Sequence, residues 1–148
     1  MVKRKVSVEP PPLQQHGLLV SNARVKPPQQ LSELSSKPIG TISGYVYTEF
    51  SEAMGKHFKR DDAPNMTLNI RKFFFERFDY AAVDELSYLY LLKREKPTLK
   101  LNKPLITSQY QFYCAISPHS SLSTAQVNKA VNALQKSGKI QAILQRYR

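Results

Sequence analysis

The sequence predicts an α/β fold, with a short and mostly parallel β-sheet flanked by helices. Short β-favouring runs alternate with stretches whose apolar residues recur at helical spacing. One of these runs, Tyr80–Val83, is wholly apolar, which is typical of a central parallel strand covered on both faces. Two amphipathic helices with clear start and stop signals are predicted in the last thirty residues. Strands that alternate with helices in this way indicate an α/β layer.

The composition agrees with a folded chain. Its 148 residues are 41% hydrophobic and include 8 Tyr and 7 Phe, enough for the core of one ordinary domain. The formal net charge of +11 would favour polyanions, anionic membranes or acidic ligands, but a solvated basic surface is the simpler explanation. The single cysteine, Cys114, excludes an internal disulfide, and its apolar neighbours predict a buried, inert thiol.

Residues 1–36 are predicted to form an extended, proline-rich segment and a crossover strand. Only Gly17–Val20 has the composition of a strand. The basic start, Met1–Lys5, is followed by Glu9 and three prolines where a signal peptide would need an apolar stretch. We therefore expect the chain, expressed as written, to stay in the cytoplasm.

Residues 37–110 are predicted to form one α/β lobe. Four strands are expected, at Ile39–Ile42, Met66–Asn69, Tyr80–Val83 and, more weakly, Leu99–Leu101. Three helices are expected between and after them, at Thr48–Phe58, Arg71–Phe78 and Leu86–Lys93. Ser43 and Gly44 form the turn after the first strand, and Asn69 could cap the second helix. The charged residues around Asp61 and Asp62 are predicted to be a solvated loop.

Residues 111–148 are predicted to form a strand at Gln111–Ile116 and two helices. Ser123 and Gln126 fit a capping box at the start of the first helix. Gly138 marks its end, and the second helix is expected at Lys139–Arg148.

The sequence shows no catalytic or metal-binding constellation. His16, His57 and His119 lie far apart, without metal-ligand spacing. Neither a nucleophile elbow nor a phosphate-cradling glycine motif is present. We therefore expect no enzymatic activity, no metal site and no cofactor.

Two segments of the sequence are candidates for binding a small charged ligand. The turn at Ser43–Tyr47 leaves a strand and enters a helix, so its backbone N–H groups could receive a carboxylate or another anion. Asp84 follows the apolar strand, at the sheet edge where open α/β sheets bind ligands, and could hold an ammonium group. From the residues alone, an N-cap for the next helix is the simpler role for Asp84.

Together these segments resemble the amino-acid-binding type of bacterial periplasmic solute-binding protein, the family 3 extracellular solute-binding proteins of ATP-driven transporters. Ile39–Tyr47 is similar to the strand and turn that open the family's second lobe, and Phe78–Asp84 resembles its stretch of Asp, Ala, two apolar residues and Asp. Phe112–Ile116 and Leu122–Tyr147 resemble the return strand and closing helices. The resemblance implies a type II periplasmic-binding-protein lobe, covers residues 17–148 and leaves the first lobe largely absent.

The resemblance implies a periplasmic, two-lobed protein that closes on a small solute and delivers it to membrane transporter subunits. By position, Asp84 would contact the α-amino group of the solute, and Gly44, Tyr45 and Val46 would receive its carboxylate. The family usually has Thr or Ser beside the turn glycine. Tyr45 and Val46 stand there in this chain, which argues against a standard amino acid, and Tyr45 and Tyr47 could instead pack a ring or an apolar group.

The absent first lobe has two expected consequences. The chain alone should bind solute poorly or not at all, because one charged hydrogen bond contributes only about 1.5–3 kcal/mol. The apolar faces of residues 111–148 would lack their usual cover and could self-associate.

Two alternatives remain open. A basic nucleic-acid-binding module would explain the charge of +11, but the turn between the terminal helices is short and no aromatic platform is present, so we expect no nucleic-acid partner. A ligand-sensing lobe of a signalling protein, or a regulatory domain of a lytic enzyme, would use the same fold.

Overall fold

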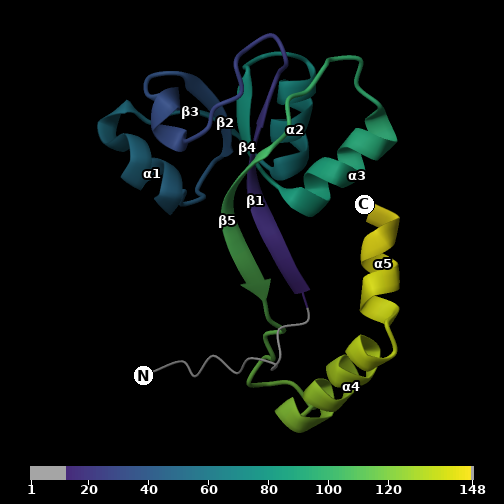
Figure 1. Cartoon of the computed structure of the whole chain (residues 1–148). Helices are drawn as coiled ribbons and strands as arrows, with labels where there is room; N and C mark the ends of the chain where they lie inside the picture. The colour runs from purple at the N-terminus through teal and green to yellow at the C-terminus, as the bar shows by residue number, and fades with distance from the viewer. Residues whose placement is uncertain (1–12, 148) are drawn as a thin grey trace. The chain divides into compact units, whose positions relative to one another are not determined.

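The computed structural model describes residues 13–147 and shows a five-stranded mixed sheet with helices on both faces (Figure 1). The strands are β1 (Leu13–Ser21), β2 (Pro38–Ile42), β3 (Lys59–Ala63), β4 (Tyr80–Asp84) and β5 (Leu105–Phe112), in the spatial order β3-β2-β4-β1-β5. The α-helices are α1 (Thr48–Met54), α2 (Met66–Phe74), α3 (Glu85–Glu95), α4 (Thr124–Lys136) and α5 (Lys139–Tyr147), with short 3-10 helices at Leu31–Leu34 and Gly55–His57. The predicted α/β class is confirmed.

The chain divides into two compact units, and the sheet core lies in the unit His16–Gln109. The chain from Tyr110 onward, with α4 and α5, belongs to the other unit. Within the described residues, every helix is too short or too polar to cross a membrane.

Strand β4 lies in the middle of the sheet and is covered on both faces, as its apolar composition predicts. Ala81 and Val83 face a cluster that includes Phe73 of α2 and Leu91 of α3. Tyr80 and Ala82 face a second cluster, which α1 and the first 3-10 helix complete. Alternate residues of the strand therefore join two separate apolar layers.

Strands β3, β2 and β4 run parallel, so their carboxyl ends meet at one edge of the sheet. Gly40 of β2 is opposite Ala81 of β4, and Thr41 is opposite Asp62 of β3. Strand β1 pairs antiparallel with β4. The edge at which the three parallel strands end is the edge where the sequence predicts ligand binding.

The prediction of a strand at Met66–Asn69 and a helix at Arg71–Phe78 is wrong, because a single helix, α2, begins at Met66. Its cap is Asn65, whose side-chain oxygen accepts a hydrogen bond from Leu68 N at 2.9 Å. Asn69 lies inside the helix, fully buried, and donates from Nδ2 to the carbonyl oxygen of Ala82 at 2.9 Å. The helical spacing of Ile70 and Phe73, which both enter the core, outweighs the local β-propensity.

The prediction of a loop around Asp61 and Asp62 is also wrong. Lys59–Ala63 forms strand β3, which lies at the edge of the sheet and pairs with β2 along its whole length. Charged residues are common on edge strands because they discourage pairing with another chain. The pairing partner, rather than the composition of the segment, determines its structure.

Other strands and helices begin or end several residues away from their predicted boundaries. β5 ends at Phe112 and shares only two residues with the predicted strand Gln111–Ile116, and Leu99–Leu101 contributes one isolated bridge, between Leu101 and Asn22. The helix from Thr48 ends at Met54. The predicted capping box of Ser123 and the two closing helices are confirmed. The interpretation of Met1–Lys5 and Glu9 falls outside the described residues.

Candidate functional site

The turn at Gly44 and the carboxylate of Asp84 stand at the same edge of the sheet. Because β2 and β4 run parallel with Gly40 opposite Ala81, Ser43 and Asp84 come level where the two strands end. The structure therefore places at one edge of the sheet two segments that are forty residues apart in the chain and that are predicted independently from the sequence.

The backbone of the turn is fixed by two hydrogen bonds. Ser43 N donates to Ala63 O at 2.9 Å, and Tyr45 N donates to Ile42 O at 3.2 Å. Gly44 has φ +77°, a left-handed conformation that favours glycine. Within residues 13–147 we find no acceptor for the N–H groups of Gly44 and Val46. The side chains of Tyr45 and Val46 are 62% and 84% exposed, so this part of the turn is open to a ligand.

Arg60 of strand β3 holds the turn from its carbonyl side. Its Nη1 donates to Tyr45 O at 2.9 Å, and its Nη2 donates to Ile42 O at 2.7 Å. The guanidinium also bonds to the carboxylate of Asp62 at 2.9 Å and lies 5.2 Å from the ring centroid of Tyr47. Arg60 is not predicted as a site residue from the sequence, because its local charge pattern resembles a solvated surface.

Asp62 links Arg60 to the buried part of the sheet. The hydroxyl of Thr41, a buried residue of β2, donates to Asp62 Oδ1 at 2.6 Å. This hydrogen bond, together with the charge and hydrogen bond of Arg60, lowers the pKa of the Asp62 carboxyl group although partial burial opposes the shift. The carboxylate is therefore held ionised between a strand and the turn.

The side chain of Tyr47 is partly buried and makes its contacts within the lobe. Its hydroxyl oxygen accepts a hydrogen bond from Ile42 N at 2.9 Å, and its ring packs edge-on against Phe50 and Phe58. Burial raises the pKa of the Tyr47 hydroxyl. Of the two tyrosines that the sequence predicts at the site, Tyr45 is the one whose ring is mainly exposed.

Asp84 ends β4 and begins α3. Its Oδ1 accepts a hydrogen bond from Ser87 N at 2.8 Å, so the capping role is present. A carboxylate has two oxygens and about four lone-pair sites, so a cap bond does not exclude an ammonium ligand. Next to it, Glu85 Oε2 lies 3.0 Å from His16 Nδ1. A ligand at this edge would therefore meet a region rich in carboxylate oxygens.

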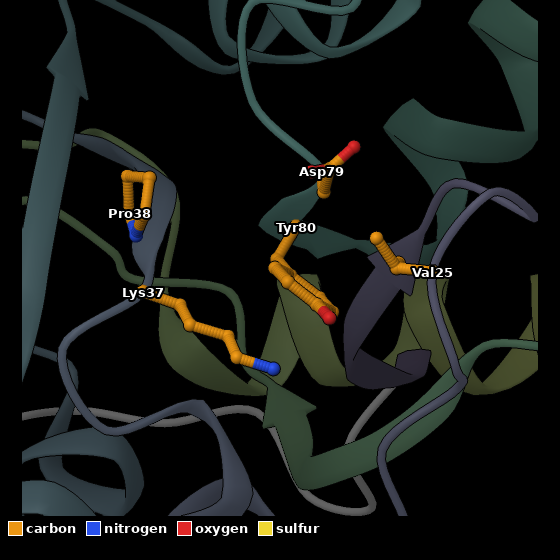
Figure 2. Close-up of a pocket in the computed structure, with 5 residues that line it drawn as sticks. All are labelled: Val25, Lys37, Pro38, Asp79 and Tyr80. Carbon is orange, nitrogen blue, oxygen red and sulfur yellow. The ribbon is translucent and has the colours of Figure 1, made fainter.

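A pocket of about 160 Å³ lies at the opposite ends of the same strands (Figure 2). Its walls are formed by Val25, Lys37, Pro38, Asp79 and Tyr80. Pro38 and Tyr80 are the first residues of β2 and β4, so the pocket is at the amino edge. The side chain of Lys37 extends toward the hydroxyl end of Tyr80, with Nζ 5.5 Å from the ring centroid (Figure 2). None of the residues that the sequence predicts for binding lines it.

The histidines and the cysteine form no cluster. Among residues 13–147, no three His, Cys, Asp or Glu side chains are arranged to hold a metal ion. Cys114 is only partly buried, in contrast to the buried thiol that its apolar neighbours predict.

No protein-family model and no curated protein matches the chain. Solved structures do. An ancestral arginine-binding protein bound to arginine superposes with a TM-score of 0.71 and 17% identity, over 93% of this chain and 62% of that protein. The GluR0 ligand-binding core in complex with L-glutamate has a TM-score of 0.76 and 13% identity, over 95% and 62% of the two chains.

A third structure is a proposed binding component of an ABC transporter from Wolinella succinogenes, complexed with lysine. Its TM-score is 0.75 and its identity 14%, over 97% of this chain and 62% of that one. The chain therefore spans about 62% of the length of each of these three amino-acid-binding proteins. At such low identities the likeness establishes the fold, and the chain has the fold of part of a type II periplasmic binding protein.

Proposed function

We propose that this chain is the second lobe of a solute-binding component of an ATP-driven transporter, and that it contacts an amino acid or a related small solute. The observation that supports the proposal is that the parallel strands β2 and β4 end at the same edge of the sheet, where β2 leads into the turn of Gly44 and β4 ends at Asp84. The fold supports it, because the three solved structures named above hold arginine, glutamate and lysine. None of those three is a nucleic-acid-binding module, so we do not propose nucleic acid as a partner.

Each residue has a distinct role in the proposed complex. The carboxylate of Asp84 would accept hydrogen bonds from the solute's ammonium group. The N–H groups of Gly44 and Val46 would donate to its carboxylate, and the exposed ring of Tyr45 would pack against its side chain. Tyr47, whose hydroxyl holds Ile42, would support the turn. These contacts bind a solute without chemical change to it.

The affinity of this chain alone is proposed to be weak. In a two-lobed binding protein the solute is enclosed between both lobes, and this chain carries the contacts of the second lobe only. Two charged groups held by exposed hydrogen bonds give dissociation constants on the order of 1 mM. In the intact arrangement, the partner would be the membrane subunits of the transporter and the site of action the periplasm.

Solute titration followed by NMR tests the proposal, because chemical shifts detect millimolar binding. Asp84→Asn removes the charge and keeps a capping side chain, and Glu95→Gln removes a carboxylate from the far end of the same helix as a control. We expect saturable shifts at Gly44–Tyr47 with arginine, lysine or glutamate for the native chain and for Glu95→Gln, and at least a tenfold weaker response for Asp84→Asn. Nα-acetylglutamate, which has no ammonium group, should not bind.

Two results would overturn the proposal. One is an absence of shifts at the turn with every amino acid up to the solubility limit. The other is an Asp84→Asn variant with native affinity, because the ammonium contact would then have no role.

We also propose that helices α4 and α5 associate with a second copy of the chain. Only Val131 of α4 and Leu144 of α5 are buried, whereas Leu134 and Ile143 are 42% and 51% exposed. Exposed apolar side chains on amphipathic helices favour association. Sedimentation should show a dimer that Leu134→Gln weakens; a monomer at all concentrations would contradict this part.

A further inference from the structure

We propose that Arg60 is the positioning residue of the carboxylate-receiving turn, and that solute affinity depends on its two hydrogen bonds to the carbonyl oxygens of Ile42 and Tyr45. This inference rests on the function proposed above. Arg60 would act through the backbone of the turn, without touching the solute.

The geometry of the peptide bond gives the reason. In a trans peptide, the carbonyl of one residue and the N–H of the next lie in one plane and point in opposite directions. Arg60 Nη1 holds the carbonyl oxygen of Tyr45 at 2.9 Å, so it also fixes the direction of the N–H of Val46. That N–H points away from Arg60 and is one of the two open donors of the turn.

The second hydrogen bond of Arg60 fixes the start of the turn. Nη2 holds Ile42 O at 2.7 Å, and the next N–H, that of Ser43, is directed to Ala63 O. The two hydrogen bonds of Arg60 therefore hold both ends of the turn, at Ile42 and at Tyr45. The bond to Tyr45 O fixes the open N–H of Val46 directly, and the open N–H of Gly44 lies between the two carbonyls that Arg60 holds.

Arg60 is itself held in place by two neighbours, Asp62 and Tyr47. Asp62 pairs with Nη2 and is anchored by the hydroxyl of Thr41, and the ring of Tyr47 lies beneath the guanidinium. Its side chain is only 30% exposed. A planar guanidinium that is already bonded to two carbonyls and a carboxylate has no second fork to offer a solute, so its influence is indirect.

Arg60→Lys separates position from charge. A lysine keeps the positive charge near the turn, but its single ammonium group cannot reproduce the planar fork across two carbonyls. If Arg60 acted only as a nearby positive charge, Arg60→Lys would keep the native affinity. If it positions the turn, Arg60→Lys should lose affinity almost as strongly as Arg60→Met.

The experiment combines two measurements on the full chain. The first, without solute, is amide hydrogen exchange at Ser43 and Tyr45, the two hydrogen-bonded amides of the turn, with Ala81 of the central strand as the internal reference. The second is the NMR titration with arginine, lysine and glutamate. Arg71→Met and Arg71→Lys are the matched controls, because Arg71 forms an ion pair with Glu95 and has no bond to the turn.

We expect both Arg60 variants to exchange the Ser43 and Tyr45 amides at least tenfold faster, with Ala81 unchanged, and to bind solute about tenfold more weakly. Both Arg71 variants should behave as the native chain. Unchanged exchange at Ser43 and Tyr45 in Arg60→Met would overturn the inference. So would native affinity in Arg60→Lys, or faster exchange without any loss of affinity.

A failure of the proposed function would look different. If the native chain bound no amino acid, the titration would reject that function, and the affinity part of this inference with it. The exchange measurement would still decide whether Arg60 orders the turn.

Discussion

The backbone N–H of Ser87 donates a hydrogen bond to Oδ1 of Asp84 at 2.8 Å, so the carboxylate at the end of the central strand also starts helix α3. One side chain therefore has a structural role that is observed and a binding role that is proposed. The two roles need different chemistry, because a cap requires an acceptor and an ammonium ligand favours a negative charge.

Asp84→Ala and Asp84→Asn should separate these roles. Alanine removes the cap and should lower the free energy of unfolding by about 1 kcal/mol, whereas asparagine is as good a cap as aspartate and should have little effect. Urea denaturation of both variants measures the difference. Equal destabilisation by both substitutions would mean that the charge of Asp84, rather than its capping bond, supports the fold.

Gly40→Ala should destabilise the lobe by steric overlap. A Cβ at this position would lie 2.2 Å from Cε2 and Cζ of Phe78 and 2.6 Å from Oδ1 of Asn69. Overpacking of this kind typically costs about 1–3 kcal/mol, which a shift of the urea midpoint would measure. Adding Phe78→Leu removes the ring atoms that clash and should recover part of the loss. No recovery in the double variant would point to Asn69 as the group that cannot move.

Acid should weaken the contact between β3 and the turn through Asp62. The pKa of Asp62 is lowered in the folded chain from its ordinary value of 3.8, chiefly by the hydrogen bond from Thr41. A lowered carboxyl pKa contributes stability above the unfolded pKa, and this contribution is lost as the pH falls through the folded pKa. The melting temperature should therefore decrease as the pH drops below about 4, and this decrease should be less steep in Asp62→Asn than in the native chain.

Glu52→Gln, an exposed substitution on α1, is the control for the acid experiment and should keep the native pH profile. Thr41→Val removes the main cause of the shift, so the pKa of Asp62, followed by NMR, should rise. An unchanged Asp62 titration in Thr41→Val would contradict the assignment.

Alkali should weaken the lobe through Tyr88. Burial raises the pKa of this hydroxyl from 10.0 to about 12, because the phenolate would lose hydration in the layer between β4, α2 and α3. Since the folded pKa is raised, the stability from the neutral hydroxyl is complete below the unfolded pKa and is lost as the pH rises through the folded one.

Unfolding measured between about pH 9 and pH 12 should show this loss in the native chain and a flatter profile in Tyr88→Phe. Ultraviolet absorbance should show late-ionising tyrosines, because burial raises the pKa of both Tyr47 and Tyr88, and Tyr88→Phe should remove one of them. If Tyr88 titrated together with the exposed tyrosines, the burial of its hydroxyl would be incorrect.

The sequence predicts those parts of the fold whose signals are local. Tyr80–Val83 is apolar throughout and is followed by a carboxylate, and the structure has a central strand there that ends at Asp84. Ser123 and Gln126 have the spacing of a capping box, and both of its hydrogen bonds are present. In these places the residues that form the element also specify it.

The sequence does not predict the parts that depend on distant partners. Lys59–Ala63 has no apolar alternation and becomes a strand only by pairing with β2. The role of Arg60 follows from that pairing, because its bonds to Ile42 and Tyr45 join residues 18 and 15 positions apart. For α2, the start signal is Asn65, which follows Pro64 and precedes a run whose local β-propensity predicts a strand instead.

The place of β1 in the sheet also affects how the lobe is made. β1 is the first described strand that leaves the ribosome, but its two neighbours in the sheet, β4 and β5, are both synthesised later. Ser21 pairs with Tyr80 and Gly17 with Asp84, so the first strand has no partner in the sheet until residue 80 has emerged. Closing so long a loop is slow compared with local folding. During synthesis, β1 is therefore the segment whose backbone is open longest to chaperones, proteases and other nascent chains.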